Sequence, residues 1–221
     1  MTSVLLSLSA LLASSALAVP TAGATPPAGR PAAVPSGWEA VDGAELARIA
    51  GETNTRRAPS AARDGVSATA AEPELTAMQS ARNGKFVATE VNYAVPNTGV
   101  LRARSADIGG AWEGFAFEWN ETTQTYALRS LANDRYAAVE KNFTGSAQNV
   151  LRARSTGVGG WEQFIVYYNE GLDRWALQST LNGLFVTMEN SYTGSLQYVL
   201  RARSAEITGS WEEFFLYNIG A

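Results

Sequence analysis

A five-residue sequence, Leu-Arg-Ala-Arg-Ser, occurs three times in this chain, at residues 101–105, 151–155 and 200–204. Six or seven residues after each copy comes a Trp-Glu-x-Phe tetrad, which begins at Trp112, Trp161 and Trp211. The tryptophans are 49 and then 50 residues apart. Such a period means that one supersecondary unit is used three times, and this constrains the fold more than any local pattern does.

The rest of the unit repeats together with these two motifs. In the first copy, four short runs rich in aromatic and β-branched residues occupy about 75–80, 85–90, 100–105 and 112–119. Turn-forming pairs such as Asn83-Gly84 separate the runs, which is typical of strands joined in hairpins. The sequence therefore predicts twelve strands in about 147 residues, in repeats at about 75–125, 126–174 and 175–221.

Three equivalent four-strand units predict an all-β fold for residues 73–221. A pseudo-threefold barrel capped by hairpins removes the exposed sheet edges that invite aggregation. The alternative is a fragment of a propeller, whose blades also have four strands, but a propeller ring usually needs at least about four blades. We therefore predict a β-trefoil.

The order of landmarks also carries a resemblance. Each copy reads Ala-hydrophobic-x-Ser, Asn-(Gly/Asp)-x-aromatic, Glu, Leu-Arg-Ala-Arg-Ser and Gly-x-Trp-Glu-x-Phe. Over residues 75–221 this resembles the fascin-like branch of the β-trefoil superfamily, which implies one complete trefoil. Fascins crosslink actin with four such trefoils in tandem, and similar single modules are appended to secreted carbohydrate-active proteins. The ricin-type sugar-binding branch carries Gln-x-Trp, which this sequence lacks, so its sugar-binding residues cannot be transferred.

The N-terminal third differs in composition from the repeats. Residues 4–19 form a run of 16 apolar and small residues, followed by Pro20 and Ala22-Gly23-Ala24. This is the length of a signal-peptide core and is too short for a comfortable membrane span. Residues 1–3 carry no Lys or Arg, so the usual basic n-region is missing, which either a misplaced start codon or a weak n-region would explain. We expect a signal peptide at 1–24 and a secreted protein.

Residues 25–72 are rich in Ala, Pro, Ser, Gly and Thr, which is typical of a linker that buries no core. Within this segment, Asp42 and Glu45 have the spacing of a capping box before Leu46 and Ile49. We expect a disordered linker with a short helix at about 43–50, which packs loosely or belongs to a removed pro-segment.

Composition excludes several kinds of chemistry. The sequence has no Cys and no His, which excludes disulfides, thiol nucleophiles, Ser–His triads and nearly every zinc site. A net charge of −4 argues against a nucleic-acid partner. There is no phosphate-binding glycine loop and no calcium-loop pattern, so no cofactor and no metal is expected.

Carboxylates are the remaining catalytic candidates, because glycoside hydrolysis needs two of them. The glutamates that recur in all three copies are Glu90, Glu140, Glu189, Glu113, Glu162 and Glu212. Internal symmetry favours a scaffold role over a single active site, so we predict no enzyme and keep a carboxylate-based glycoside hydrolase as an alternative. We expect these glutamates to face arginines that point outward, such as Arg102 and Arg104, while Leu101 and Ala103 point inward.

Two further interpretations concern binding. The repeated arginines could instead line a site for an acidic glycan. The tetrad aromatics are predicted to belong to the core: Trp112, Phe115, Trp161, Phe164, Trp211 and Phe214.

The loop between the second and third strands of each copy is the predicted ligand site. It places an aromatic ring beside hydroxyl and amide groups, which suits a neutral sugar. The predicted contacts are Asn92, Tyr93, Asn142, Phe143, Thr144, Ser146, Tyr192, Thr193 and Ser195. The alternative is that each ring folds over its own hairpin. The second and third loops share Thr-Gly-Ser, which the first lacks, so two working sites are favoured over three.

The sequence thus predicts a secreted, non-catalytic, monomeric module that binds a polysaccharide or glycan. It predicts no nucleic-acid partner and, in the mature form, no membrane. The alternative suggested by the resemblance is a protein-interaction module of the actin-binding type.

Overall fold

The computed structural model describes residues 34–57 and 73–220, so the expected signal peptide at 1–24 lies outside the described residues. Each repeat has the four predicted strands. The first repeat contains β2 (Glu74–Ser80), β3 (Phe86–Thr89), β4 (Leu101–Ser105) and β5 (Gly114–Asn120). The second contains β6 (Thr125–Ser130), β7 (Arg135–Val139), β8 (Leu151–Ser155) and β9 (Phe164–Asn169). The third contains β10 (Arg174–Ser179), β11 (Phe185–Met188), β12 (Leu200–Ser204) and β13 (Phe214–Asn218).

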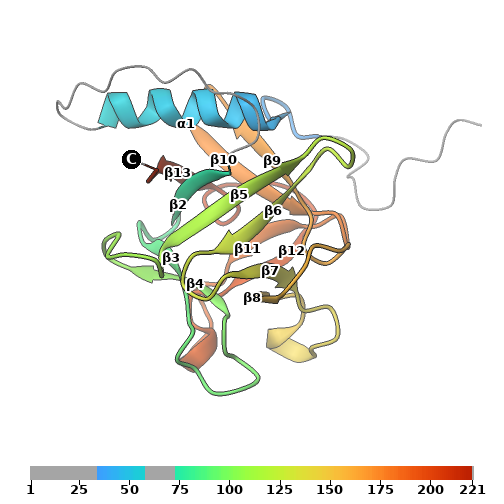
Figure 1. The fold of residues 1–221 in the computed structure, drawn as a ribbon. Coiled ribbons are helices and arrows are strands. Elements are labelled where there is room, and N and C mark those ends of the chain that lie inside the picture. Colours follow the sequence, from blue (N-terminus) through green and yellow to red (C-terminus); the bar gives the residue numbers. More distant parts are fainter. Residues whose placement is uncertain (1–33, 58–72, 221) are drawn as a thin grey trace, which may run out of the picture.

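Six of these strands close a barrel in which the first and fourth strands of the repeats alternate. The order around the barrel is β2, β5, β6, β9, β10, β13 and back to β2, with every pair antiparallel. The other strands form three hairpins, β3–β4, β7–β8 and β11–β12, which lie at one end of the barrel (Figure 1). This arrangement confirms the prediction of an all-β barrel closed by hairpins.

One set of side chains, repeated three times, fills the barrel. The tetrad phenylalanines Phe115, Phe164 and Phe214 are fully buried, as predicted. The leucines that open the Leu-Arg-Ala-Arg-Ser strands are also fully buried, and belong to the same apolar cluster: Leu101, Leu151 and Leu200. Removing this apolar surface from water is the main source of stability for a domain without disulfides.

An asparagine turn ties each first strand to the Leu-Arg-Ala-Arg-Ser strand. The side-chain amide of Asn83 donates a hydrogen bond to the carbonyl oxygen of Ala103 at 2.9 Å. Asn133 and Asn182 make the equivalent bonds in the other repeats. The next residue has a positive φ in every copy, which explains why that position is Gly, Asp and Gly: Gly84, Asp134 and Gly183.

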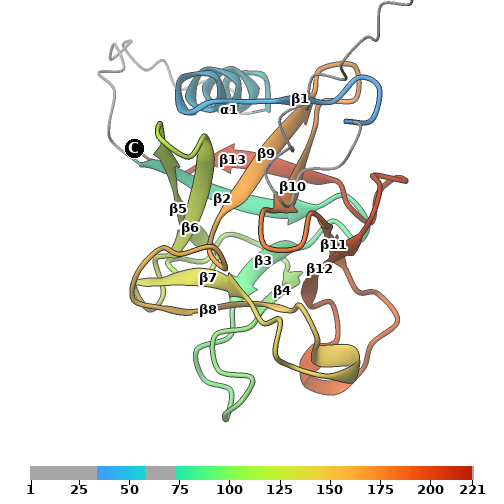
Figure 2. The same ribbon diagram turned by 90° about the vertical axis from the view of Figure 1, so that its right-hand side faces the viewer.

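The N-terminal segment packs against the barrel, which contradicts the expected linker for residues 34–57. It contains β1 (Glu39–Ala40) and α1 (Gly43–Arg57), a longer helix than the predicted 43–50. The helix lies across the end of the barrel opposite the hairpins, close to β2 and β13 (Figures 1 and 2). Leu46 is fully buried there, in the same apolar cluster as Phe117 and Trp175. The expected linker, residues 25–72, consists mostly of small residues. Its average composition therefore did not reveal the few large apolar side chains that contact the barrel.

The start of the helix has the predicted cap. Asp42 accepts a hydrogen bond from the backbone N–H of Glu45 at 2.9 Å, which satisfies one of the free amides of the first turn.

Strand β1 occupies a place where two barrel strands separate. Between β6 and β9 the paired residues are Tyr126 and Phe164, near the start of each strand. Further along β9, residues Tyr167 and Tyr168 pair with β1 instead. The N-terminal segment therefore supplies hydrogen bonds to part of an otherwise open strand edge. Within 34–57 and 73–220, no helix is long and apolar enough to span a membrane.

Candidate functional site

The three predicted ligand loops meet at the hairpin end of the barrel (Figure 1). Val100, Val150 and Val199 form a buried apolar cluster there. The predicted aromatics Tyr93, Phe143 and Tyr192 are half-buried and pack against this cluster. The structure thus brings the three rings together around one centre, in the arrangement of a ring that folds over its own hairpin.

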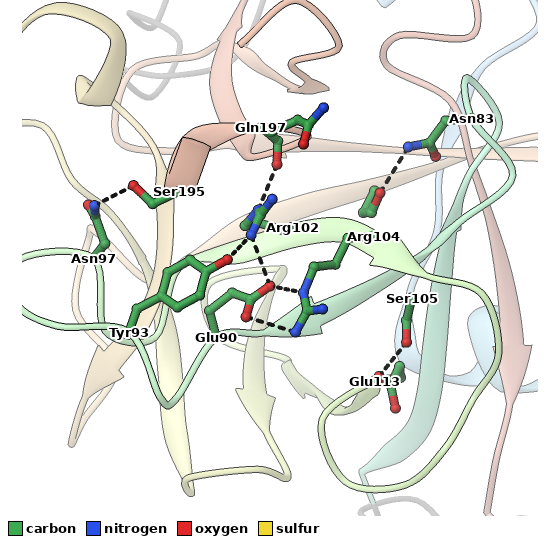
Figure 3. Close-up of polar contacts among 11 residues, drawn as sticks. Asn83, Glu90, Tyr93, Asn97, Arg102, Arg104, Ser105, Glu113, Ser195 and Gln197 are labelled. Carbon is green, nitrogen blue, oxygen red and sulfur yellow. Dashed lines mark hydrogen bonds and ion pairs between the residues drawn. The ribbon is translucent and has the colours of Figure 1, made fainter. Parts of the chain in front are cut away.

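The polar residues predicted with these rings lie on the surface. The exposed ones are Asn92, Asn142, Thr144, Ser146, Thr193 and Ser195. Ser195 accepts a hydrogen bond from the side-chain amide of Asn97 at 2.8 Å, which joins the first loop to the third (Figure 3). The matching second and third loops each contain a short 3-10 turn, η1 (Gly145–Ala147) and η2 (Gly194–Leu196). Their role in ligand binding stays a prediction.

The first arginine of each Leu-Arg-Ala-Arg-Ser strand lies beneath these rings instead of pointing into solvent. Arg102 donates from Nε to the carbonyl oxygen of Gln197, at 2.6 Å, in the third repeat (Figure 3). Arg152 reaches a carbonyl of the first repeat and Arg201 one of the second, at 2.6 and 2.7 Å. The three bonds form a cycle that joins each repeat to a neighbour.

The prediction that both arginines point outward is therefore wrong for the first of each pair. Alternation places Arg102 on the outer face of β4, but a loop of the neighbouring repeat covers that face. Burial lowers the pKa of the Arg102 guanidinium, although the nearby Glu90 carboxylate opposes this.

The glutamates that precede these loops are buried, and each pairs with both arginines of its repeat. Figure 3 shows Glu90 between Arg102 and Arg104. In the third repeat, Glu189 lies 3.6 Å from Arg201 and 2.6 Å from Arg203. Burial raises the pKa of Glu189, and the two arginines act against that shift. The predicted pairing is confirmed, but it lies inside the fold.

The tetrad glutamates have a different role from the one predicted. Glu113 accepts hydrogen bonds from the backbone N–H of Gly109 at 3.1 Å and from the hydroxyl of Ser105 at 2.8 Å. Glu162 and Glu212 accept backbone N–H groups of their own loops, at 2.8 and 3.1 Å. These carboxylates brace the loop before the fourth strand because its amides need acceptors.

The tetrad tryptophans lie on the surface, which contradicts their assignment to the core. Trp112 is 38% exposed, and Trp161 and Trp211 are half-buried. Each tryptophan lies in the turn before the fourth strand, whereas the phenylalanine stands at the start of that strand and enters the barrel. The glycines just before the tetrads, at 109–110, 159–160 and 209, were the signal in the sequence that could have placed the tryptophans in a turn.

Arginines lie over two of these indole rings, those of Trp161 and Trp211. The guanidinium carbon of Arg82 lies 4.3 Å from the ring centroid of Trp211, and that of Arg154 lies 5.6 Å from Trp161. Apolar residues of the same loops are also exposed, namely Ile108 and Val158. The result is three equivalent braced loops with a tryptophan at the surface, exposed at Trp112 and half-buried under an arginine at the other two. In the described part of the chain, no cluster of three His, Cys, Asp or Glu side chains is placed to hold a metal.

No protein-family model and no curated protein matches this sequence. Solved structures do share its fold. The designed threefold-symmetric protein ThreeFoil is 17% identical, covers 66% of this chain and 99% of its own, and superposes with a TM-score of 0.53. The ricin B-like lectin of Macrolepiota procera, solved with lactose, is 10% identical, with coverages of 68% and 99% and a TM-score of 0.51.

A lectin of Polyporus squamosus, solved with a human-type influenza-binding epitope, is 15% identical with a TM-score of 0.50. It covers 66% of this chain, which spans 49% of that lectin. At such identities the likeness shows the β-trefoil fold and nothing finer. The fascin-like branch stays a prediction.

Proposed function

We propose that this protein is a secreted, monomeric carbohydrate-binding module with no catalytic activity of its own. The observation that carries the proposal is the set of three braced loops with outward tryptophans, led by Trp112 at 38% exposure. An aromatic face at the surface suits a sugar ring, because ring stacking combines with hydrogen bonds to neighbouring polar groups.

The bracing matters for affinity. Glu113, Glu162 and Glu212 hold the backbone of these loops in place before any ligand arrives. A preorganised loop loses little conformational entropy on binding, so more of the contact energy remains as affinity. Three equivalent loops on one module also gain from effective concentration when the ligand is a polymer.

The structural neighbours support the same class of ligand. Two lectins that share the trefoil fold were solved with lactose or with a glycan epitope. The sequence lacks the Gln-x-Trp motif of the ricin-type branch, so the sugar-binding residues of that branch cannot be transferred to this chain. Sugar binding by the tryptophan loops therefore needs a test of its own.

The absence of catalysis is part of the proposal. Glu90, Glu140 and Glu189 are each held by two arginines, and the tetrad glutamates are held by loop amides or hydroxyls. A glycosidase needs one carboxylic acid to protonate the leaving group and a second carboxylate beside it. Carboxylates that are already committed to the scaffold are poorly suited to that role.

A glycan array probed with the intact chain tests the proposal. We expect binding to at least one polysaccharide or glycan class, and at least a tenfold loss in the triple variant Trp112→Ala, Trp161→Ala, Trp211→Ala. Leu172→Ala is the matched control, because Leu172 is 52% exposed on the β9–β10 turn and belongs to none of these loops. No binding by the intact chain, or equal binding by the triple variant, would contradict the proposal.

Secretion and the monomeric state need separate measurements. N-terminal sequencing of protein from the culture medium should find a chain that begins near residue 25. Light scattering of the mature protein should give the mass of one chain.

A further inference from the structure

A cleft of about 660 Å³ lies between the N-terminal segment and the barrel. Asp42 and Glu45, at the start of α1, form one wall, and the β5–β6 turn forms another. Trp119 of β5 and Ile165 of β9 contribute apolar surface. The volume and the mixture of aromatic, aliphatic and a few polar groups are those of a small-molecule site.

Two polar atoms beside this cleft have no partner. The indole Nε1 of Trp119 and the hydroxyl of Tyr126 are both buried, and neither finds a hydrogen-bond partner among the described residues. The two rings contact each other, with centroids 4.9 Å apart. Tyr126 is 1% exposed, and burial together with nearby carboxylates such as Asp42 raises the pKa of its hydroxyl, which therefore remains a neutral donor. Both donors are closed off from solvent and therefore from a ligand in the cleft, whose chemistry follows from the side chains that line it.

The polar groups that line the cleft indicate the chemistry of its ligand. Hydroxyls and side-chain amides of Thr123, Thr180, Gln124 and Gln163 line the cleft. The first three also make hydrogen bonds within the fold, which leaves their remaining acceptor or donor positions for a ligand. The charged groups are the carboxylates of Asp42 and Glu45, and no basic side chain lines the cleft among the described residues. This combination favours a hydroxyl-rich ligand that is neutral or positively charged, and disfavours an acidic one.

We propose that this cleft binds an amine-bearing sugar unit, a 2-amino-2-deoxyhexose of a glycan chain, with Trp119 as its aromatic wall and the carboxylates of Asp42 and Glu45 facing the ammonium group. This site is separate from the three tryptophan loops and rests on the proposed function only for the class of ligand.

The position of the cleft fits an extended chain. Gly160, which lines the cleft, precedes Trp161 in the sequence and belongs to the same loop. A glycan longer than one unit therefore reaches from the cleft toward the surface that carries Trp161. The N-terminal segment completes the site, which gives its tight packing on the barrel a role in binding.

Calorimetric titration of the full chain with three oligomers of equal length tests the inference. The probes are oligomers of glucosamine, of N-acetylglucosamine and of glucose. We expect the glucosamine oligomer to bind at least tenfold more tightly than the other two. The double variant Asp42→Asn, Glu45→Gln should lose that preference, while its helix remains capped because Asn caps as well as Asp does. Asp134→Asn with Glu170→Gln is the matched control, since it removes two exposed carboxylates that belong neither to the cleft lining nor to the tryptophan loops.

A second variant addresses the aromatic wall. Trp119→Leu keeps an apolar side chain against Tyr126 but removes the ring, and we expect a loss of about three- to tenfold in affinity for the glucosamine oligomer, because the sugar loses its aromatic wall. The triple tryptophan-loop variant should keep the amine preference.

The outcomes separate this inference from the proposed function. Binding that disappears in the tryptophan-loop variant but is unchanged by Asp42→Asn, Glu45→Gln overturns the cleft and leaves the proposed function standing. Amine-selective binding that survives in the tryptophan-loop variant supports the cleft, even where the array result contradicts the loops. Equal affinity for all three oligomers, or no binding, overturns the cleft.

Discussion

Gly43, the first residue of α1, lies against the indole ring of Trp119. A Cβ atom placed on Gly43 would approach both Cβ and Cγ of Trp119 to 3.0 Å, which is closer than ordinary van der Waals contact. The absence of a side chain at this one position allows the helix to begin directly on the barrel and to close the cleft described above. It explains why a residue with poor helix propensity starts the helix.

Gly43→Ala should therefore destabilise the protein by about 1–3 kcal/mol, the usual cost of forcing an extra methyl group into a packed contact. Gly51→Ala in the same helix is the matched control, because a Cβ atom there meets nothing within 4 Å. That control should be neutral or stabilising by up to about 1 kcal/mol, from helix propensity alone. Urea denaturation monitored by tryptophan fluorescence measures both. Equal effects of the two changes would show that the close Gly43–Trp119 contact does not affect the free energy of unfolding.

Leu46 tests whether the N-terminal segment is an integral part of the fold. Its side chain is fully buried in the main apolar cluster. Leu46→Ala should cost about 2–5 kcal/mol of unfolding free energy, as expected for a buried leucine. Arg48 lies two positions further along the helix, and its side chain is 57% exposed. Arg48→Ala should therefore change the free energy of unfolding by no more than about 0.5 kcal/mol. A Leu46→Ala protein with unchanged thermal stability would restore the linker interpretation.

Limited proteolysis gives an independent measurement of the same packing. In the native protein, bonds within residues 38–50 should resist cleavage, because their apolar side chains lie against the barrel. Rapid cleavage there under native conditions would contradict the docked segment.

The two arginines that share Glu189 should differ sharply in their effect on stability. Arg201 is 10% exposed and also bonds to a backbone carbonyl of the second repeat, whereas Arg203 is 54% exposed. Arg201→Ala should cost about 3–5 kcal/mol, because it leaves a buried carboxylate with one fewer partner. Arg203→Ala should cost at most about 1 kcal/mol. Denaturant titrations of the two variants measure both costs. Similar losses of unfolding free energy would count against a structural role for the cycle of arginine–carbonyl bonds between repeats.

The repeat made the barrel predictable, because a period near 50 with landmarks in register left few architectures open. The same symmetry misled the interpretation of single residues. Alternation along β4 correctly placed Leu101 inside and Arg104 outside. It failed for Arg102, since no local pattern reveals that a loop of another repeat covers the outer face of that strand.

The cleft could not be predicted from the repeat, since one wall of it, formed by residues 40–42 and Glu45, comes from outside the repeats. Asp42 and Glu45 were recognised as a helix cap, which the structure confirms. Their approach to Trp119 depends on tertiary packing that an average over composition cannot show. The tryptophans of the tetrads were a different case, because the glycines just before them marked a turn, whereas large aromatics at symmetric positions were assigned to the core.

The last prediction decides between packing and ligand contact for Phe143 and Tyr192. Both rings pack on the valine cluster, and Arg152 and Arg201 lie against them, with guanidinium carbons 6.0 and 5.7 Å from the ring centroids. The double change Phe143→Ala, Tyr192→Ala should therefore lower the unfolding free energy by about 3–5 kcal/mol or more, the usual cost of truncating a packed aromatic.

Tyr192→Phe is the matched control, because the second repeat already has phenylalanine at this position over its own arginine. It removes a hydroxyl that accepts a hydrogen bond from Arg201, so we expect a cost of about 1–2 kcal/mol and intact binding on the glycan array. If instead the double variant keeps its full stability and loses glycan binding, the rings are ligand contacts. The predicted loop site would then replace the tryptophan loops as the binding surface.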